Sequence, residues 1–228
     1  MPHNPIIVAL DVESAGQART IVRHIGPAID FYKVGLELYT AAGLDLVKEL
    51  IAEGKQIFLD LKMYDISETV KRAAAQVARI DGIRFLTVHA SKAVVQAAVE
   101  ATVGSNLQIL AVTVLTSYDQ SDLADLGYTC TVPELVAHLA RKAAEAGTHG
   151  LVCSPLEVTN IRQIIGDEKP LITPGVRSPG TDAGDQKRVA TPAQAIKNGA
   201  TYLVMGRQIT RAAHPAAEVK RVLDEISA

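Results

Sequence analysis

Residues 56–65 read QIFLDLKMYD, and this stretch governs the interpretation of the rest of the chain. Its first half is a short apolar run, which predicts a buried β-strand, and a helical pattern begins directly after it. Side chains alternate along a strand, so Asp60 and Lys62 are expected on the same face. Asp65 adds a second acid close by. The stretch therefore predicts an acid and an amine held side by side where a strand ends.

Charged residues also end two earlier apolar runs. Asp11 follows the run 6–10, and Lys33 ends the run 29–33. Charges of alternating sign at buried strand ends are unfavourable unless they are partnered, and such clusters are typical of functional sites. A structural ion pair is the other interpretation of Asp60 and Lys62, and the charges at equivalent strand ends weigh against it.

The alternation of strand and helix runs through the whole sequence. Continuous apolar runs, typical of parallel strands buried on both faces, lie at 6–12, 31–35, 56–62, 85–89, 108–115, 150–154, 170–174 and 202–206. Amphipathic helices are expected between and after them, at 15–25, 44–53, 67–80, 93–103, 133–146, 156–165, 192–198 and 215–226. The pattern predicts an α/β fold, a single-domain (β/α)8 TIM barrel over residues 1–228, with a doubly wound open sheet as the alternative.

Length and composition agree with this prediction. The 228 residues, 48% hydrophobic and 21% charged, suit one large core and argue against disorder. A net charge of −2 gives no general attraction to nucleic acid or to an anionic membrane. Neither a signal peptide nor an apolar run near the roughly 18 residues of a membrane span is evident, so a cytoplasmic protein is expected. Cys130 and Cys153 show no metal-binding spacing.

The charged strand ends are expected to meet in space. In a barrel, the C-terminal ends of the strands converge on one mouth, so Asp11, Lys33, Asp60 and Lys62 should become neighbours there. His89 ends the fourth predicted strand, and a hydrogen-bonding supporting role is expected for it rather than a catalytic one.

The last two predicted strands indicate a phosphate site. They end in Gly175-Val176-Arg177 and Gly206-Arg207. Barrels commonly bind phosphate in the loops after these strands, where backbone N–H groups reach the oxygens and arginine adds bidentate bonds. Loop 178–186 contains two glycines and is either a surface loop or a lid over this phosphate.

Two residues are expected to reach the distal part of a substrate. Gln186, in the predicted lid, would bridge the phosphate and that distal part. Thr116, at the end of the fifth predicted strand, is a candidate hydrogen-bond partner for the same part, or simply a loop cap.

Residues 60–69, DLKMYDISET, resemble the D-x-K-x-x-D-I-x-x-T signature of the orotidine 5′-phosphate decarboxylase family. Departures are mild, with Met63-Tyr64 in place of the common Phe-His and Ser67-Glu68 in place of Pro-Asn. The order and spacing resemble the compact bacterial form of the family, and further matching stretches follow in order at 9–11, 33–35, 88–91, 115–117, 173–177, 184–186 and 206–210.

The resemblance implies a (β/α)8 barrel that decarboxylates orotidine 5′-phosphate to UMP, the last step of de novo pyrimidine nucleotide synthesis, without a cofactor or metal. Lys62 would donate a proton to C6 of the pyrimidine as the carboxylate leaves. Asp60 would lie near the substrate carboxylate and hold Lys62. Lys33 and Asp11 would bind the ribose hydroxyls, with Lys33 also ordering Asp60.

The remaining implied roles concern the partner subunit, the base and the phosphate. Asp65 and Thr69 would reach into the neighbouring subunit's site, which implies a homodimer with shared sites. Thr116 would contact the base, Gln186 the phosphate and base, and the phosphate end would be held by Arg177, Gly206 and Arg207.

Two alternatives remain open at this point. The related 3-keto-gulonate 6-phosphate decarboxylases and hexulose-phosphate synthases resemble this chain in fold and in a D-x-K-x-x-D strand end, but they use a metal and an enediolate. Loss of activity on chelation would favour them. A catalytically silent nucleotide-binding barrel is the other alternative, and the intact Asp60, Lys62 and Asp65 count against it.

Overall fold

The computed structural model describes residues 4–181, 184 and 187–227, and its strands close into a barrel in chain order. Every neighbouring pair, including the first and last strands, is parallel. The strands are β1 (Ile6–Ala9), β2 (Phe31–Gly35), β3 (Gln56–Met63), β4 (Ile83–His89), β5 (Gln108–Val112), β6 (Gly150–Val152), β7 (Leu171–Thr173) and β8 (Tyr202–Met205). The predicted (β/α)8 barrel is confirmed, and the open sheet is excluded.

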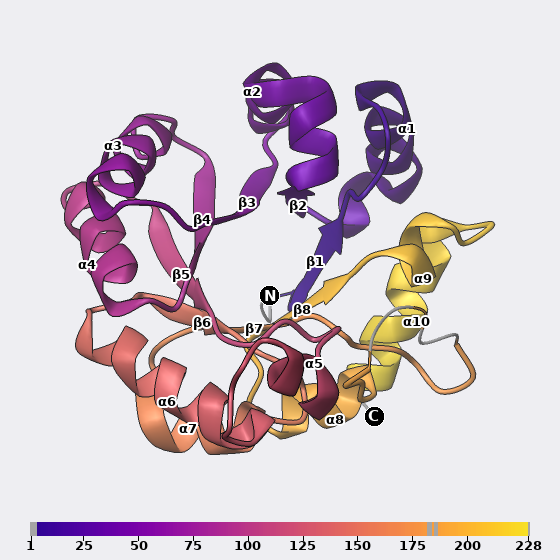
Figure 1. Cartoon of the computed structure of the whole chain (residues 1–228). Helices are drawn as coiled ribbons and strands as arrows, with labels where there is room; N and C mark the ends of the chain where they lie inside the picture. Colours follow the sequence, from indigo (N-terminus) through magenta and orange to yellow (C-terminus); the bar gives the residue numbers. More distant parts are fainter. Residues whose placement is uncertain (1–3, 182–183, 185–186, 228) are drawn as a thin grey trace.

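Helices form a ring around the strands (Figure 1). The main ones are α1 (Ala15–Ile25), α2 (Leu36–Ala52), α3 (Ser67–Val77), α4 (Lys92–Ala101), α6 (Val132–Glu145), α7 (Val158–Ile165), α8 (Pro192–Lys197) and α10 (Pro215–Ser227). Helix α2 begins earlier than predicted, at Leu36, because it continues across a kink at Gly43, whose φ is 61°. The first half of α2 is therefore a correction to the sequence-based prediction.

Three short elements were not predicted. They are the 3-10 turn η1 (Gly26–Ala28), α5 (Gln120–Asp125) and α9 (Arg207–Thr210). Helix α5 lies in the predicted loop after β5, where Asp119 and Asp122 form a capping box. Helices of four to six residues are too short to establish a hydrophobic period, so the pattern of apolar residues missed them.

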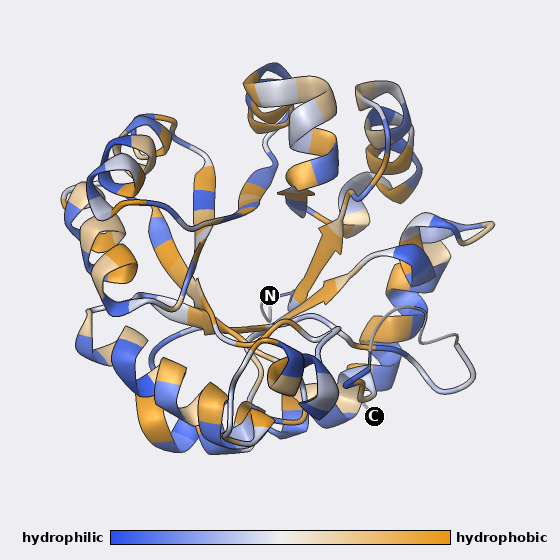
Figure 2. Ribbon diagram, viewed as in Figure 1, coloured by the Kyte–Doolittle hydropathy of each residue, from blue (hydrophilic) through white to orange (hydrophobic). Residues whose placement is uncertain are grey.

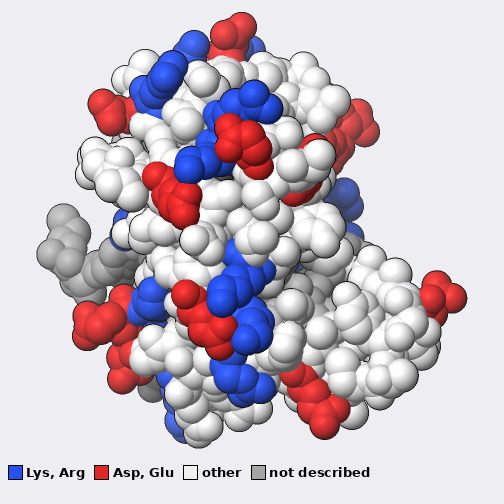
Figure 3. Space-filling view, turned by 60° about the vertical axis from the view of Figure 1, so that its left-hand side comes forward, with Lys and Arg blue, Asp and Glu red and all other residues white. Residues whose placement is uncertain are grey.

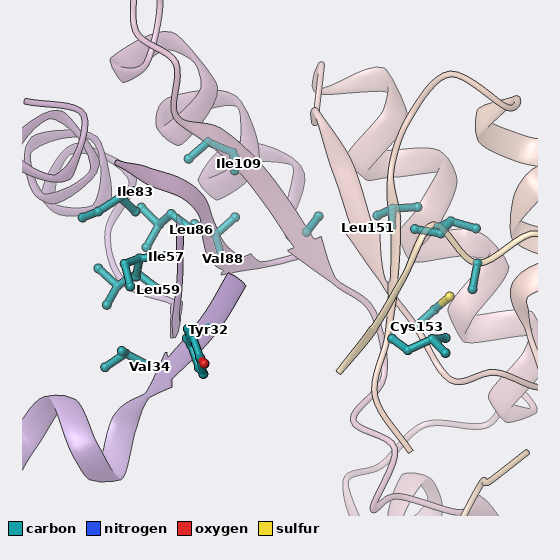
Figure 4. Close-up of a cluster of buried hydrophobic side chains, with 14 of the residues drawn as sticks. Tyr32, Val34, Ile57, Leu59, Ile83, Leu86, Val88, Ile109, Leu151 and Cys153 are labelled. Atoms are coloured by element: carbon teal, nitrogen blue, oxygen red, sulfur yellow. The ribbon is translucent and has the colours of Figure 1, made fainter. Parts of the chain in front are cut away.

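The strands carry two separate apolar layers because their side chains alternate between faces. On β3, Ile57 and Leu59 face the helices, whereas Phe58 belongs to the barrel interior. Figure 4 shows part of the outer layer, with Tyr32 and Val34 beside these β3 residues. The hydropathy colouring shows the same arrangement, with apolar strands inside a ring of two-faced helices (Figure 2).

Aromatic rings fill the interior at the N-terminal ends of the strands. Phe31, Phe85 and Tyr202 lie with ring centroids 5.4–5.7 Å apart. The Arg84 guanidinium lies over all three rings, 5.2–5.6 Å from their centroids. This end of the barrel is therefore closed by packing, and the opposite end is left for a site.

The surface and the helices add two observations. Basic and acidic side chains are interspersed on the face drawn in Figure 3, in keeping with the net charge of −2. Over the described ranges, none of the helices combines the length and apolar character needed to cross a membrane.

Candidate active site

A cavity of about 470 Å³ opens at the C-terminal ends of the strands. It is lined by eight of the residues predicted for the site, namely Asp11, Lys33, Asp60, Lys62, Thr116, Arg177, Gly206 and Arg207. Gln186, the other residue predicted for the lid side, lies outside the described residues. The barrel thus brings together residues from β2, from β3 and from the segments that follow four other strands, β1, β5, β7 and β8.

The charges at one end of the cavity form a chain of ion pairs. Lys33 Nζ lies 2.7 Å from Asp11 Oδ1 and 3.4 Å from Asp60 Oδ2. Lys62 Nζ lies 2.8 Å from the same oxygen of Asp60. The side chains of Lys33 and Asp60 are buried, while that of Lys62 is 30% exposed. Of the two lysines in this set of ion pairs, Lys62 is therefore the one whose side chain is more exposed to the cavity.

Lys33 and Asp60, the two buried residues of these ion pairs, remain ionised. Burial disfavours the charged form of Lys33, but the carboxylates of Asp60 and Asp11 outweigh it and raise the pKa of Lys33. Burial likewise opposes the ionised form of Asp60, but Lys33, Lys62 and a hydrogen bond from Thr87 together lower the pKa of Asp60. At neutral pH the site holds fixed full charges in a mostly buried setting.

Asp60 and Lys62 lie on the same face of β3, as predicted, because both line the cavity while Leu61 and Met63 pack against the outer apolar layer. The pairing with β4 is irregular at this point, because a bulge separates the pair of Leu59 and Leu86 from the pair of Met63 and Val88. Lys62 has a φ of 47°, and it is the non-glycine residue with positive φ within the described part of the chain. A bulge of this kind is a common way to re-aim a side chain beside an active site.

The end of β2 needs glycine because the charge network lies against it. A Cβ atom on Gly35 would stand 2.7 Å from Lys33 Nζ and 3.0 Å from Asp11 Oδ1. Any larger residue would push the ammonium or the carboxylate away. The glycine after Lys33 and Val34 therefore supports the site, although it contributes no side chain to it.

Two arginines mark the other end of the cavity. Arg177 follows β7, and Arg207 follows Gly206 at the start of α9, directly after β8. Gly184 lies close to this end, since a Cβ atom built on it would stand 2.6 Å from Nη2 of Arg207. Gly184, which belongs to the loop after β7, therefore lies against the arginine end of the cavity.

Comparison with known proteins gives the same picture. The sequence model of the orotidine 5′-phosphate decarboxylase / HUMPS family matches residues 4–222. The chain belongs to this family. A Bradyrhizobium protein named orotidine 5′-phosphate decarboxylase is 50% identical over 226 residues, which cover 99% of this chain and 93% of that protein. A protein of the same name from Afipia carboxidovorans is 48% identical, covering 99% of this chain and 96% of its own length.

A solved structure supports the family assignment. The crystal structure of orotidine 5′-phosphate decarboxylase from Lactobacillus acidophilus superposes with a TM-score of 0.86 at 37% identity, covering 99% of this chain and all of that one. The resemblance seen in residues 60–69 is thus confirmed at the level of the family, over nearly the whole chain.

Two residues that the family resemblance singled out lie away from the cavity of the single chain. Asp65 and Thr69 are exposed, and neither lines the cavity. Asp65 accepts a hydrogen bond from the backbone N–H of Ile66 at 2.6 Å. Their carboxylate and hydroxyl groups therefore do not meet Lys62 across the cavity of their own chain.

His89 lies beside the site without lining the cavity. Burial, assisted by the positive charge of Lys62, lowers the pKa of His89, so the imidazole is neutral at pH 7. Its ring packs against Tyr64 with centroids 5.4 Å apart. The hydrogen-bonding supporting role expected for His89 stays a prediction.

The two ends of the loop after β7 are anchored by residues that the sequence did not single out. At one end, Gln208 accepts from the backbone N–H of Ser178 at 3.1 Å and donates to the Ser178 hydroxyl at 2.8 Å. At the other end, buried Arg188 pairs with Glu157 and donates to the carbonyl of Leu115 at 2.8 Å. No local pattern signals these contacts, because each partner lies 30 or more residues away.

The alternative sugar-phosphate enzymes use a metal, which makes clusters of metal-binding side chains relevant here. In the described portion of the chain, no three His, Cys, Asp or Glu residues gather in a way that could hold a metal ion. Cys153 is buried, which raises the pKa of its thiol, as expected for a packing residue.

Proposed function

We propose that this chain decarboxylates orotidine 5′-phosphate to UMP without a cofactor, and that Lys62 protonates C6. The observation that carries the proposal is the Lys62 ammonium, held 2.8 Å from buried Asp60 at the wall of a cavity whose far end carries two arginines. A cation at one end and a phosphate-binding end opposite suit a phosphorylated substrate that develops negative charge on carbon. The names of the two full-length relatives support the same substrate.

The chemistry follows from charge. When the C6–carboxylate bond breaks, CO₂ leaves and the electron pair stays on C6 in an orbital that the ring cannot delocalise. A preorganised cation stabilises such a charge best in a site with little water. Lys62 would supply that cation and then its proton, giving UMP. Asp60, on the other side of Lys62, would repel the substrate carboxylate and lose this repulsion as CO₂ departs.

The loop after β7 fits the role of a lid. Both of its ends are anchored, at Ser178 and Arg188, and Gly184 lies against Arg207. A phosphate between Arg177 and Arg207 would add contacts that favour the closed loop. Binding energy from the phosphate would thereby help to exclude water at C6. Gln186 is proposed to bridge the phosphate and the base, and Thr116 to contact the base.

The ribose would lie between these two ends. Lys33 and Asp11 line the cavity beside Asp60 and are 2.7 Å apart. An ammonium can donate to a sugar hydroxyl and a carboxylate can accept from one. We therefore assign these two residues to the ribose hydroxyls.

A homodimer with shared sites is proposed on the basis of the segment after β3. Asp65 and Thr69 are exposed there, next to Tyr64 and Ile66, whose exposed fractions are 70% and 75%. Large apolar side chains so exposed are typical of an interface. A partner covering this segment would receive Asp65 and Thr69 at the edge of its own cavity.

Complementation tests the shared site. Lys62→Ala and Asp65→Ala are each expected to be nearly inactive, but a co-refolded equimolar mixture should recover activity. In a two-fold dimer, half of the molecules are mixed and one of their two sites is intact, so about a quarter of the wild-type activity is expected. A mixture no more active than its components would contradict the sharing of Asp65.

The reaction itself is tested by mixing purified protein with orotidine 5′-phosphate in the presence of EDTA and following the pyrimidine absorbance. The expected result is full conversion to UMP, with release of CO₂. Activity that disappears with EDTA and returns with a divalent metal would favour the metal-dependent sugar-phosphate enzymes of the same fold. Binding of UMP without turnover would instead indicate a silent nucleotide-binding barrel.

A further inference from the structure

The bulge in β3 places three residues opposite one. Between the pairs Leu59–Leu86 and Met63–Val88, the segment Asp60-Leu61-Lys62 faces Thr87 alone. Thr87 is completely buried. It lies in the middle of the apolar run of β4 and does not line the cavity.

The hydroxyl of Thr87 is bonded to both residues of the acid–amine pair. Its oxygen accepts from the backbone N–H of Lys62 at 2.9 Å. It donates to Asp60 Oδ1, also at 2.9 Å. Because an N–H can only donate and an ionised carboxylate can only accept, the direction of both bonds is determined.

These two bonds constrain different parts of the site. The first replaces the strand-to-strand bond that the Lys62 N–H loses in the bulge, and so holds a φ of 47° that lysine rarely adopts. The second occupies Oδ1 of Asp60, so that Oδ2 is turned toward the ammonium groups of Lys62 and Lys33. One hydroxyl therefore fixes both the backbone of the lysine and the plane of the carboxylate.

We propose that Thr87 is a positioning residue for the reaction, which holds Lys62 and Asp60 in the arrangement needed at C6. The proposal rests on the role assigned to Lys62 under the proposed function. Thr87 does not touch the substrate. It acts by fixing the position of the Lys62 ammonium. A displacement of about 1 Å at a reacting centre is enough to lower a rate by about 100-fold.

Thr87→Val tests the proposal, because valine keeps the shape of the side chain and removes the hydroxyl. The expected result is a fall in kcat of about 10- to 100-fold, with KM and UMP affinity close to wild type. Thr87→Ser keeps the hydroxyl and should restore most of kcat. If Thr87→Val does not fold, Thr87→Cys replaces it, since a thiol is a weak donor and acceptor.

Thr148→Val is the matched control. Thr148 is also completely buried, and its hydroxyl donates to the carbonyls of Ile109 and Gly150 at the closed end of the barrel. Its loss should lower stability without changing kcat. Equal kcat values for Thr87→Val, Thr148→Val and wild type would overturn the proposal and leave Thr87 as a structural residue.

The pH dependence of kcat gives a readout that a structural role would not move. The bond from Thr87 favours the ionised carboxylate and contributes to the lowered pKa of Asp60. The acid limb of the profile should therefore shift to higher pH in Thr87→Val and stay in place in Thr87→Ser. An unshifted limb together with an unchanged kcat contradicts the proposal. If the wild type does not convert orotidine 5′-phosphate, the proposed function fails first and this role of Thr87 fails with it.

Discussion

Lys62 combines an unusual backbone with one close ionic partner among the described residues. Its φ of 47° belongs to a region that glycine prefers, and its ammonium lies 2.8 Å from Asp60. Strained backbone is retained where the surrounding structure holds it and a function needs it. Here the strained conformation of Lys62 is stabilised by the hydrogen bond from its N–H to Thr87 on the neighbouring strand.

Replacing this lysine should separate binding from turnover. Lys62→Ala is expected to lose about 4 kcal/mol or more of transition-state stabilisation, because the cation matters most when the charge develops on C6. UMP affinity should change little. Steady-state kinetics and calorimetry with UMP would measure the two effects. Lys220→Ala, at an exposed lysine paired with Asp224, serves as the control. Lost UMP affinity with normal turnover would refute the role.

The buried charges also predict a pH dependence of stability. The pKa of Asp60 lies below its ordinary 3.8, so the stabilisation from its ionised form is present above that pH and is lost as pH falls through the lowered value. The pKa of Lys33 lies above its ordinary 10.5, so its contribution is present below that pH and is lost as pH rises through the raised value.

Asp60→Asn should therefore cost about 3 kcal/mol of unfolding free energy at neutral pH, because it leaves buried Lys33 with a weaker set of partners. The difference from wild type should be constant between about pH 5 and 9 and should shrink below about pH 4. Urea denaturation across this range would measure it. A difference that varied between pH 5 and 9 would point to other titrating groups.

At the scale of elements, the loops after β5 and β7 behave as one unit. Lys187 Nζ lies 2.8 Å from both Asp119 and Asp122 at the start of α5, and its backbone N–H donates to the carbonyl of Thr116. Arg188 adds a bond to the carbonyl of Leu115. The segment around Thr116, which is proposed to contact the base, is thereby hydrogen-bonded to the C-terminal end of the proposed lid.

The arginine end of the cavity carries its own prediction. Arg207→Ala should lower kcat/KM for orotidine 5′-phosphate by about 100-fold or more, since bidentate bonds to phosphate would be lost. The same change should matter far less for orotidine, which has no phosphate. Measuring kcat/KM of wild type and Arg207→Ala with both substrates would test this prediction. Equal losses would rule out a contact between Arg207 and phosphate.

At the scale of the whole molecule, the barrel separates stability from chemistry. Phe31, Phe85 and Tyr202 close one end around Arg84, while the charged residues line the other. Because of this division, the aromatic end of the barrel can be tightly packed while the charged end stays open. It is the usual arrangement of barrel enzymes, whose sites lie at the C-terminal ends of the strands.

Arg84→Met should therefore affect stability alone. Loss of its contacts with the three rings and of its bond to Gln56 is expected to cost about 1–2 kcal/mol, while kcat/KM stays within about twofold of wild type. Thermal denaturation and kinetics would measure both. Arg23→Met, at an exposed position on α1, is the control. A large loss of activity from Arg84→Met would show that the two ends are coupled.

Local patterns were enough to predict the barrel and most of the strand ends that meet at its mouth. The limits of β2 and α1 agree with the prediction, and Lys33, Asp60 and Lys62 line one cavity as expected. Short helices such as α5 and α9 were missed because they contain too few residues to show a period. The continuation of α2 to Leu36 was missed because it crosses a glycine kink.

The sequence by itself determined the alternation of apolar runs and amphipathic helices, and therefore which residues end a strand, because those properties depend on neighbours in the chain. Tertiary structure alone decided the backbone conformation of Lys62 and the groups that hold the end residues in place. The positive φ of Lys62, its bond to Thr87 and the anchoring of Arg188 all require contacts between strands and loops that lie 25 or more residues apart. Such contacts exist only once the barrel has closed.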